Sequence, residues 1–564
     1  MNKTRALYKA FSSNLEMPKP NGEKKVKIYN RFGMIAFIGI MVPISVAVGY
    51  ITYILTDLLY VFDGNSYGLL SELDLISAFA MIFCLPLMFS VLFFSSDLQF
   101  LTALPVSSAS LYSARFWHTF KAENVMTSNV LFAIYIGYFA SCIKNSSLAS
   151  ALHPVALISS VVGFFGSLLV PLIYCSIIGM LLMLALRRFN RTDIYYHSSL
   201  VLFIGFALLF LLSFRGYGSI SVVNYLDSLV VSNNTFTSIC NVMFPTNYLT
   251  TLAIRTHRIF PLIVSVVIIA ALYALSVLVA HLTYRKGLFA AFIISDKKSS
   301  ARSGKTCVSR SVFSSLVMKE VRVLMRTMTY RMNCVYANLL WPVAAVIFIA
   351  EAPKFEFFLK LSYMLSTGDP WSHVLMFAVF IAAAFIASGL NSIASTSFTR
   401  EGVHIDMLKY LPADLGKQIR AKVLIAILFT FIPEAVAVIL VSVSLGVPYL
   451  IPLYIAVSFV CIFIATMIGV LMDSISPYTV WSDELSALRG NLNCFFNLAA
   501  EMAAALVAGV IAYGLYKLTG SAVITISAVS ALLIAGGGCL FGCRTSAGKE
   551  EYRNAQVNFF GISD

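Results

Sequence analysis

The sequence predicts an all-α, polytopic membrane protein with twelve transmembrane helices in two parallel six-helix repeats. Three observations lead to this fold class: an apolar composition, a series of long apolar runs, and an uneven placement of basic residues. Of the 564 residues, 59% are hydrophobic and 12% are charged. Soluble proteins contain about 45–50% apolar and about 25% charged residues. A chain of this composition needs lipid as its solvent.

Apolar runs of about 18 residues or more are the sequence signal of membrane-spanning helices. Such runs occur at twelve places along the chain. The predicted spans cover residues 32–56, 71–94, 122–143, 154–186, 198–214, 259–281, 332–352, 372–396, 423–446, 449–473, 494–515 and 519–541.

Basic residues fix the predicted orientation. If the amino terminus is cytosolic and the spans alternate, 33 of the 40 Lys and Arg residues fall on cytosolic segments. This asymmetry follows the positive-inside rule, so we expect a plasma-membrane protein with both termini in the cytosol. The net charge of +14 then reflects topology and attraction to anionic membrane lipid, and it does not call for a nucleic-acid partner.

A polar linker divides the chain. Residues 296–312 separate a first half, 1–295, from a second half, 313–564. Each half has an even number of predicted spans, so both enter the membrane in the same direction, as parallel repeats do. Each half also begins with a basic amphipathic stretch that predicts an interfacial helix: Leu7 and Tyr8 would face lipid in the first, and Val317–Arg326 forms the second.

The first half has an additional external segment, residues 215–258, in which apolar and polar residues alternate irregularly. It is too short and too polar to span the membrane. Two interpretations stay open: an ordinary external loop, or a re-entrant piece that dips into the outer leaflet.

Several kinds of chemistry are disfavoured. The longest predicted cytosolic segment has about 50 residues, and a nucleotide-hydrolysing domain needs well over about 100. Ser299–Thr306 approaches a phosphate-binding loop, but Ser299 stands where the first glycine belongs and no apolar strand precedes it. The ten cysteines and seven histidines show no metal-ligand spacing. We therefore expect no metal site and no cofactor in this chain.

Acids inside predicted spans are candidate functional residues. Glu434 follows Pro433 in the ninth span, and Glu501 lies in the eleventh. Charge in lipid is costly, so such residues face a cavity or a neighbouring helix. Either they contact a translocated substrate, or they are structural acids that bond to an adjacent helix. Pro433 would kink its helix.

Two predicted cytosolic stretches, Asp97–Arg115 and His404–Lys422, are similar to each other. Leu104-Pro105 matches Leu411-Pro412, and Arg115 matches Lys422. In each stretch an N-cap residue, Ser107 or Asp414, follows the proline. Bare connections between helices can be as short as 2–8 residues. The retained length favours a docking surface, although duplication alone could leave both loops alike.

On these residues the chain resembles the fused, twelve-span permeases of ATP-binding-cassette exporters in Gram-positive bacteria. The segments that carry the resemblance are Thr399–Gly402, Met407–Pro412, Arg420–Lys422, the first-half stretch from Ser96 to Pro105, and Asp473–Pro477 with Trp481, Glu484, Ala487 and Asn491–Asn493. The chain departs from the family in two ways: its second half lacks the long external loop, and Arg489 stands where lysine is common. Both departures leave the substrate open.

The resemblance implies elbow and coupling helices on the cytosolic side and two separate cytosolic ATPase subunits, which would bind ATP and Mg²⁺. The chain itself would be a permease and not an enzyme, moving an amphipathic peptide, lipid or toxic compound outward. The residues expected to couple to the ATPases are Asp97, Leu104, Pro105, Arg115, Arg400, Glu401, Leu411, Pro412, Arg420 and Lys422. Pro433, Glu434 and Glu501 are the candidates for the translocation path.

Two other functions remain possible. An ion-gradient-driven secondary transporter can also have twelve spans in two parallel halves, and its transport path carries several buried acids or bases. A membrane enzyme or assembly scaffold would show clustered Asp, His or Glu side chains at the membrane edge, and the sequence has no such cluster.

Overall fold

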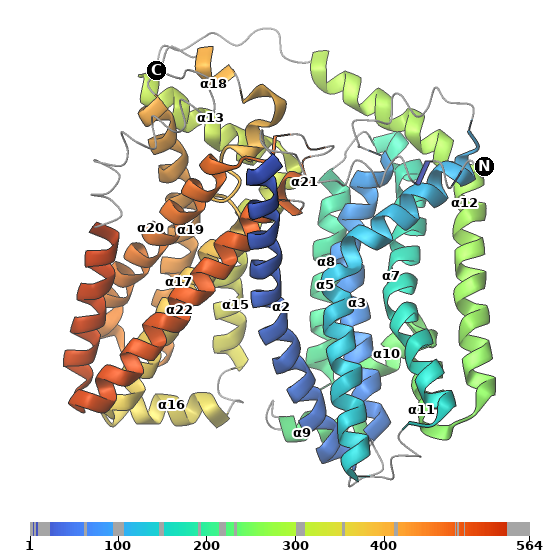
Figure 1. Cartoon of the computed structure of the whole chain (residues 1–564), viewed down its shortest axis with the longest axis horizontal. Coiled ribbons are helices and arrows are strands. Elements are labelled where there is room, and N and C mark those ends of the chain that lie inside the picture. Colours follow the sequence, from blue (N-terminus) through green and yellow to red (C-terminus); the bar gives the residue numbers. More distant parts are fainter. Residues whose placement is uncertain are drawn as a thin grey trace. The chain divides into compact units, whose positions relative to one another are not determined.

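The computed structural model consists of helices, and no β-strand occurs in the part of the chain that it describes (Figure 1). The described residues are 4, 7–8, 23–60, 65–93, 106–145, 152–189, 193–213, 222–230, 234–300, 311–351, 356–405, 407–410, 415–479, 481, 484, 486–489 and 491–538. The all-α prediction is confirmed.

The chain divides into two compact units. Unit 1 comprises Met1–Met17 and Ile38–Lys305, and unit 2 comprises Pro18–Phe37 and Thr306–Asp564. The long helices of unit 1 are α2 (Glu23–Tyr60, whose first part belongs to unit 2), α3 (Asn65–Phe93), α5 (Ser108–Asn145), α7 (Pro154–Phe189), α8 (Asp193–Leu212) and α12 (Ile259–Ser300). Because α12 ends at Ser300, it includes the first residues of the predicted linker.

Unit 2 begins with the amphipathic helix α13 (Val312–Arg326) and the short α14 (Met328–Tyr330). The π-helix η1 (Arg331–Tyr336) then continues into α15 (Ala337–Glu351). The remaining elements are α16 (Glu356–Ser366), α17 (Pro370–Asn391), the 3-10 helix η3 (Thr399–His404), α18 (Met407–Tyr410), α19 (Leu415–Ser444), η4 (Pro448–Leu450), α20 (Ile451–Ile475), α21 (Ser486–Arg489), α22 (Leu492–Thr519) and an apolar helix at Ala522–Gly538.

Eight helices in the described residues are long and apolar enough to cross a membrane: Met41–Tyr60, Ser66–Phe93, Pro154–Leu184, Ile259–Leu288, Pro370–Asn391, Gly416–Ser444, Pro448–Ile475 and Leu492–Thr519. Each coincides with a predicted span. Helices also occupy the other four predicted places, as α5, α8, η1 with α15, and Ala522–Gly538. These four do not meet the same criteria, so the count of twelve is not confirmed.

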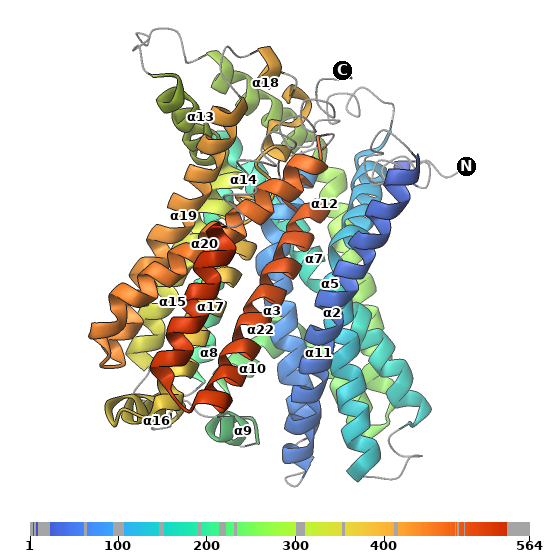
Figure 2. The same ribbon diagram turned by 60° about the vertical axis from the view of Figure 1, so that its left-hand side comes forward.

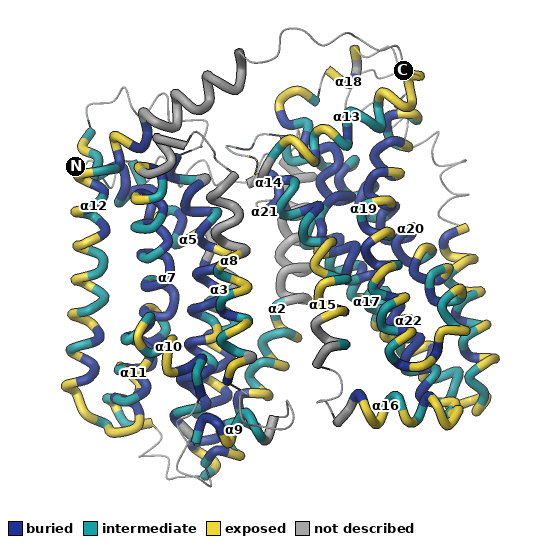
Figure 3. Tube along the Cα trace, turned by 180° about the vertical axis from the view of Figure 1, so that it is seen from behind, coloured by how far each residue is buried: buried dark blue, intermediate teal, exposed yellow. Residues whose placement is uncertain are grey.

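Burial within unit 1 separates central from peripheral helices. The spans of α3 and α7 are largely buried, whereas that of α12 is largely exposed, and Figure 3 shows the exposed residues along α12. Phe260 and Leu282 are among the exposed apolar side chains of α12. Large apolar side chains exposed along a whole helix are suited to contact with lipid.

The same helix pairs recur in the two units. The helix at the second predicted span packs against the fourth in both, as α3 with α7 and α17 with α20 (Figures 1 and 2). The third also packs against the fourth, as α5 with α7 and α19 with α20. The first contacts the third: Gly49 of α2 lies against Gly137 of α5, and α15 packs on α19.

Glycine permits the close approach of α2 and α5. A Cβ atom added at Gly137 would lie within contact distance of the Gly49 carbonyl oxygen, closer than real Cβ atoms come. Small residues let helix backbones meet in this way inside membranes.

The described part of segment 215–258 is helical. It forms α9 (Val222–Val230), α10 (Thr235–Met243) and α11 (Pro245–Thr256). Helix α11 packs against α3, α7 and α12, and its Asn247 and Thr250 are fully buried. The described part of this segment is therefore packed helical structure and not a bare loop.

Candidate functional site

Charged side chains gather at one end of unit 2, where α13, η3 and the first turns of α19 meet. Helix α13 begins after Ser311, whose side chain caps it by accepting a hydrogen bond from the Ser314 N–H. Its apolar residues Val317, Val321 and Leu324 pack into a core cluster with α19. Glu320 lies among them and is buried with them.

Three ionisable residues from three elements form a buried ion cluster, which we call the unit 2 cluster: Glu320 of α13, Glu401 of η3 and Lys422 of α19. The Lys422 ammonium lies 2.7 Å from Glu320 Oε1 and 2.8 Å from Glu401 Oε1. It also donates a 2.8 Å hydrogen bond to the Ser397 carbonyl oxygen. The cluster therefore joins α13 to segments that lie about 80–100 residues later in the sequence.

Two further cations extend the unit 2 cluster. Lys319 donates a 2.5 Å hydrogen bond to Glu401 Oε1. Buried Arg400 lies 3.9 Å from Glu320 and donates to the Ile393 carbonyl oxygen. Burial alone would raise the pKa of Glu401, but the positive charges of Lys422 and Lys319 outweigh it and lower that pKa to about 2.

This lowered pKa predicts acid sensitivity. A carboxyl group whose pKa falls on folding stabilises the native state above its ordinary pKa, 4.5 for Glu401, and the contribution disappears as the pH falls towards about 2. We expect the thermal stability of the detergent-solubilised protein to decline through this window. The Glu401→Gln variant should be less stable than the wild type at neutral pH, and its stability should fall less steeply as the pH is lowered. Glu484→Gln, which changes an exposed acid, should show neither effect. Equal slopes for wild type and Glu401→Gln would contradict the assignment.

Asp473, at the end of α20, holds the start of η3. Its Oδ2 accepts hydrogen bonds from the backbone N–H groups of Phe398 (2.6 Å) and Thr399 (3.0 Å). Its Oδ1 accepts from the Thr399 hydroxyl (2.6 Å) and from the Asn493 amide (3.0 Å). Asp473 is fully buried, so these four bonds replace its hydration.

Trp481 packs against the same turn. Its indole N–H donates a 2.9 Å hydrogen bond to the Thr399 carbonyl oxygen. Gly402 adopts a φ of +58°, and a Cβ atom there would lie 2.7 Å from the Trp481 ring. Glycine is therefore required both by the backbone conformation and by the indole. Hydrogen bonds therefore join into one assembly the residues that were named from the sequence as separate segments: Thr399–Gly402, Asp473, Trp481, Asn491 and Asn493.

The residues that follow this fixed turn are exposed and apolar. Val403, Met407 and Tyr410 are 70%, 62% and 85% exposed. Arg420 and Lys417 of α19 are also exposed. Arg420 is not part of the unit 2 cluster, because its Nε donates to Gly416 of its own helix. Exposed apolar side chains that follow a buried, hydrogen-bonded turn are suited to an interaction surface.

Unit 1 has a partial counterpart. Ser107 caps α5 by accepting a 3.2 Å hydrogen bond from the Ser110 N–H, as predicted. Arg115 is buried and donates to the carbonyl oxygen of Val91, near the end of α3. Lys422 likewise donates to a carbonyl oxygen beyond the end of α17. The matched cations thus share one feature, a hydrogen bond to a backbone carbonyl oxygen near or beyond the end of a preceding helix.

The amino-terminal prediction needs a correction. Leu7 and Tyr8 do not face lipid; both are partly buried and pack against the core of unit 1. An aromatic and an aliphatic side chain gain more from that contact than from the polar interface. Asp97, Leu104, Pro105, Leu411 and Pro412 lie outside the described residues.

The two predicted intramembrane acids are buried and separate from the unit 2 cluster. Glu434 lies in α19 directly after Pro433, and the helix continues through this proline. One carboxylate oxygen of Glu434 has no hydrogen-bond partner among the described residues. Glu501 accepts a 2.6 Å hydrogen bond from Asn497 and lies against Gly389 of α17.

Sequence reasoning missed a polar network in unit 1. Asp74 of α3 is fully buried and accepts a 3.0 Å hydrogen bond from Asn247 of α11. The Asn247 amide also donates to Ser77 and its oxygen accepts from Ser167 of α7. The signal was present, because Asp74 is an acid within a predicted span, as Glu434 is. Glu320 was also identifiable, as an acid on the apolar face of an amphipathic stretch.

No group of three or more His, Cys, Asp or Glu side chains in the described residues is placed to hold a metal ion. Comparison of the chain with family models, curated proteins and solved structures gave no match.

Proposed function

We propose that the chain is the permease subunit of an ATP-driven exporter, and that η3 and α18 of unit 2 receive one of two separate ATPase subunits. The observation that carries the proposal is the exposed patch of Val403, Met407 and Tyr410, backed by the buried bonds of Thr399, Arg400 and Glu401. A soluble partner could push on such a surface without unfolding it.

The same bonds provide a route for the motion. Lys422 and Arg420 lie in the first turns of α19, and Glu401 binds Lys422 directly. A displacement of η3 would therefore be carried into α19. Swinging a two-state transporter from 1:99 to 99:1 needs a differential binding energy of about 5.5 kcal/mol, which ATP binding at two partner sites can supply.

The recurring helix pairs support the further proposal of two parallel repeats with twelve spans. In that arrangement unit 1 would present a second coupling segment, Asp97–Arg115, to the second ATPase. Both termini and both coupling segments would lie in the cytosol. The cargo would be an amphipathic peptide, a lipid or a toxic compound.

Co-purification tests the docking surface. We expect tagged ATPase subunits to co-purify with the wild-type chain, and the triple variant Val403→Ser, Met407→Ser and Tyr410→Ser to lose about tenfold or more of that association, since buried apolar anchors carry most interface energy. Tyr363→Ser with Tyr449→Ser, at exposed positions of α16 and η4, is the matched control. Unchanged association and ATP turnover in the triple variant would contradict the proposal.

One observation favours the alternative of an ion-driven transporter. Three acids are buried in apolar helices: Asp74, Glu434 and Glu501. Two of them, Glu434 and Glu501, were identified from the sequence. Such acids occur in proton and sodium pathways. Transport by the purified chain in sealed vesicles, driven only by a proton or sodium gradient, would establish this function and exclude the first.

A further inference from the structure

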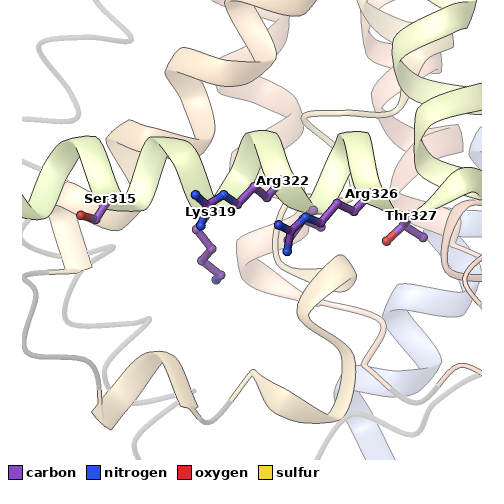
Figure 4. A pocket seen from close by; sticks show the side chains of 6 residues that line it. Ser315, Lys319, Arg322, Arg326 and Thr327 are labelled. Carbon is purple, nitrogen blue, oxygen red and sulfur yellow. The ribbon is translucent and has the colours of Figure 1, made fainter. Parts of the chain in front are cut away.

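The helix α13 carries a basic pocket that the ion cluster does not explain. It is an open pocket of about 390 Å³ lined by Ser315, Lys319, Arg322, Val323, Arg326 and Thr327. In Figure 4 the labelled side chains follow one another along α13. The spacing of three, four and seven residues places Lys319, Arg322 and Arg326 on a single helix face.

These cations are not equivalent. Lys319 is bound to Glu401 at 2.5 Å. By contrast, no carboxylate among the described residues lies within ion-pair distance of Arg322 or Arg326, and both are exposed. Two guanidinium groups held one helical turn apart repel each other, so an anion between them would lower the electrostatic energy. The hydroxyl groups of Ser315 and Thr327 add hydrogen-bond donors to the lining of the pocket.

The position of α13 indicates the source of the anion. Thr327, α14 and η1 connect it to α15, whose Leu339, Leu340 and Val343 are exposed and apolar. Val312, Phe313 and Met325 of α13 itself are also exposed. A helix that combines exposed apolar and basic side chains next to the end of a span lies at the depth of lipid headgroups.

We propose that this pocket binds the phosphate group of an anionic membrane phospholipid, with Arg322 and Arg326 as its principal ligands. Arginine suits phosphate because its planar group donates two hydrogen bonds at once. The proposal is independent of the ATPase, because it requires only the isolated chain and lipid.

Lipid binding to the purified full chain tests the proposal. Native mass spectrometry in detergent would give dissociation constants for phosphatidylglycerol and for phosphatidylcholine as the uncharged reference. Each basic residue near an anionic headgroup contributes about fivefold in affinity. We therefore expect Arg322→Gln with Arg326→Gln to weaken phosphatidylglycerol binding about 25-fold, with little change for phosphatidylcholine.

Two further variants provide controls. Lys360→Gln with Lys517→Gln removes the same charge from exposed positions of α16 and α22 and should leave phosphatidylglycerol binding unchanged. Arg322→Lys with Arg326→Lys keeps the charge but loses the paired hydrogen bonds of arginine, so its affinity should lie between that of the wild type and that of the double glutamine variant. Thermal unfolding of each variant shows whether it is folded.

Three outcomes would overturn the proposal. An equal loss in the Lys360 and Lys517 variant would mean that diffuse charge, not the pocket, attracts lipid. Inorganic phosphate that binds as tightly as phosphatidylglycerol would make the pocket a site for free anions. A double arginine variant that loses ATPase association but keeps lipid binding would assign the pocket to a protein contact.

Discussion

Replacing Lys422 by methionine is expected to destabilise unit 2 by about 3–5 kcal/mol, because it leaves Glu320 buried without its close counter-ion. Glu401 keeps Lys319 at 2.5 Å, but Lys319 and Arg400 each lie 3.9 Å from Glu320. The loss should appear as a lower midpoint of thermal unfolding in detergent and as a lower yield of folded protein.

Arg420→Met is the matched control for this prediction. It removes the same charge two residues earlier on α19, but the Arg420 side chain is exposed and, among the described residues, its hydrogen bond goes to Gly416 of its own helix. Surface substitutions of this kind change stability by about 0.5 kcal/mol or less. If Lys422→Met were no less stable than Arg420→Met, the unit 2 cluster would not hold these elements together.

Asp473→Ala is expected to have the second large effect. It leaves the buried N–H groups of Phe398 and Thr399 and the Asn493 amide without the acceptor they now share. Each unsatisfied buried donor costs about 1–3 kcal/mol, so we expect a total loss of about 3–5 kcal/mol. Because η3 contains Val403 and leads into α18, which together form the proposed docking surface, ATPase association should fall as well if that proposal is right.

Asp473→Asn separates geometry from charge. It keeps the shape and one acceptor oxygen, and should therefore lose less stability than Asp473→Ala. The measurements are thermal unfolding and ATPase co-purification of both variants. A docking surface that survives Asp473→Ala intact would show that α20 does not position η3.

The fold class could be predicted from the sequence because a membrane constrains it strongly. Lipid requires long apolar helices, and a run such as 259–281 is visible without any knowledge of packing. The ends of the helices were less predictable, since α12 continues to Ser300, beyond the predicted end of its span at residue 281. Apolar periodicity ends near residue 281, but backbone hydrogen bonds extend a helix into polar sequence.

The unit 2 cluster was only partly predictable. Lys422 was identified from the repeated pattern, and Arg400 and Glu401 from the family resemblance. Neither signal includes Glu320, because α13 lies outside those segments. Likewise, Asp473 and Thr399 were both noted, yet their hydrogen bond joins residues 74 positions apart. A single sequence carries no signal for such long-range pairs.

The contact between α2 and α5 has a mechanical consequence. Helix α5 has 38 residues, a length of about 57 Å. Towards its C-terminal end it meets α2 at Gly49 and Gly137, and at that end Lys144 and Asn145 bind Asp57 of α2. Held together at two heights, the part of α2 from Gly49 to Asp57 and the adjoining part of α5 should tilt as one stiff rod. A displacement of α5 at Gly137 would then be carried along α2 as far as Asp57.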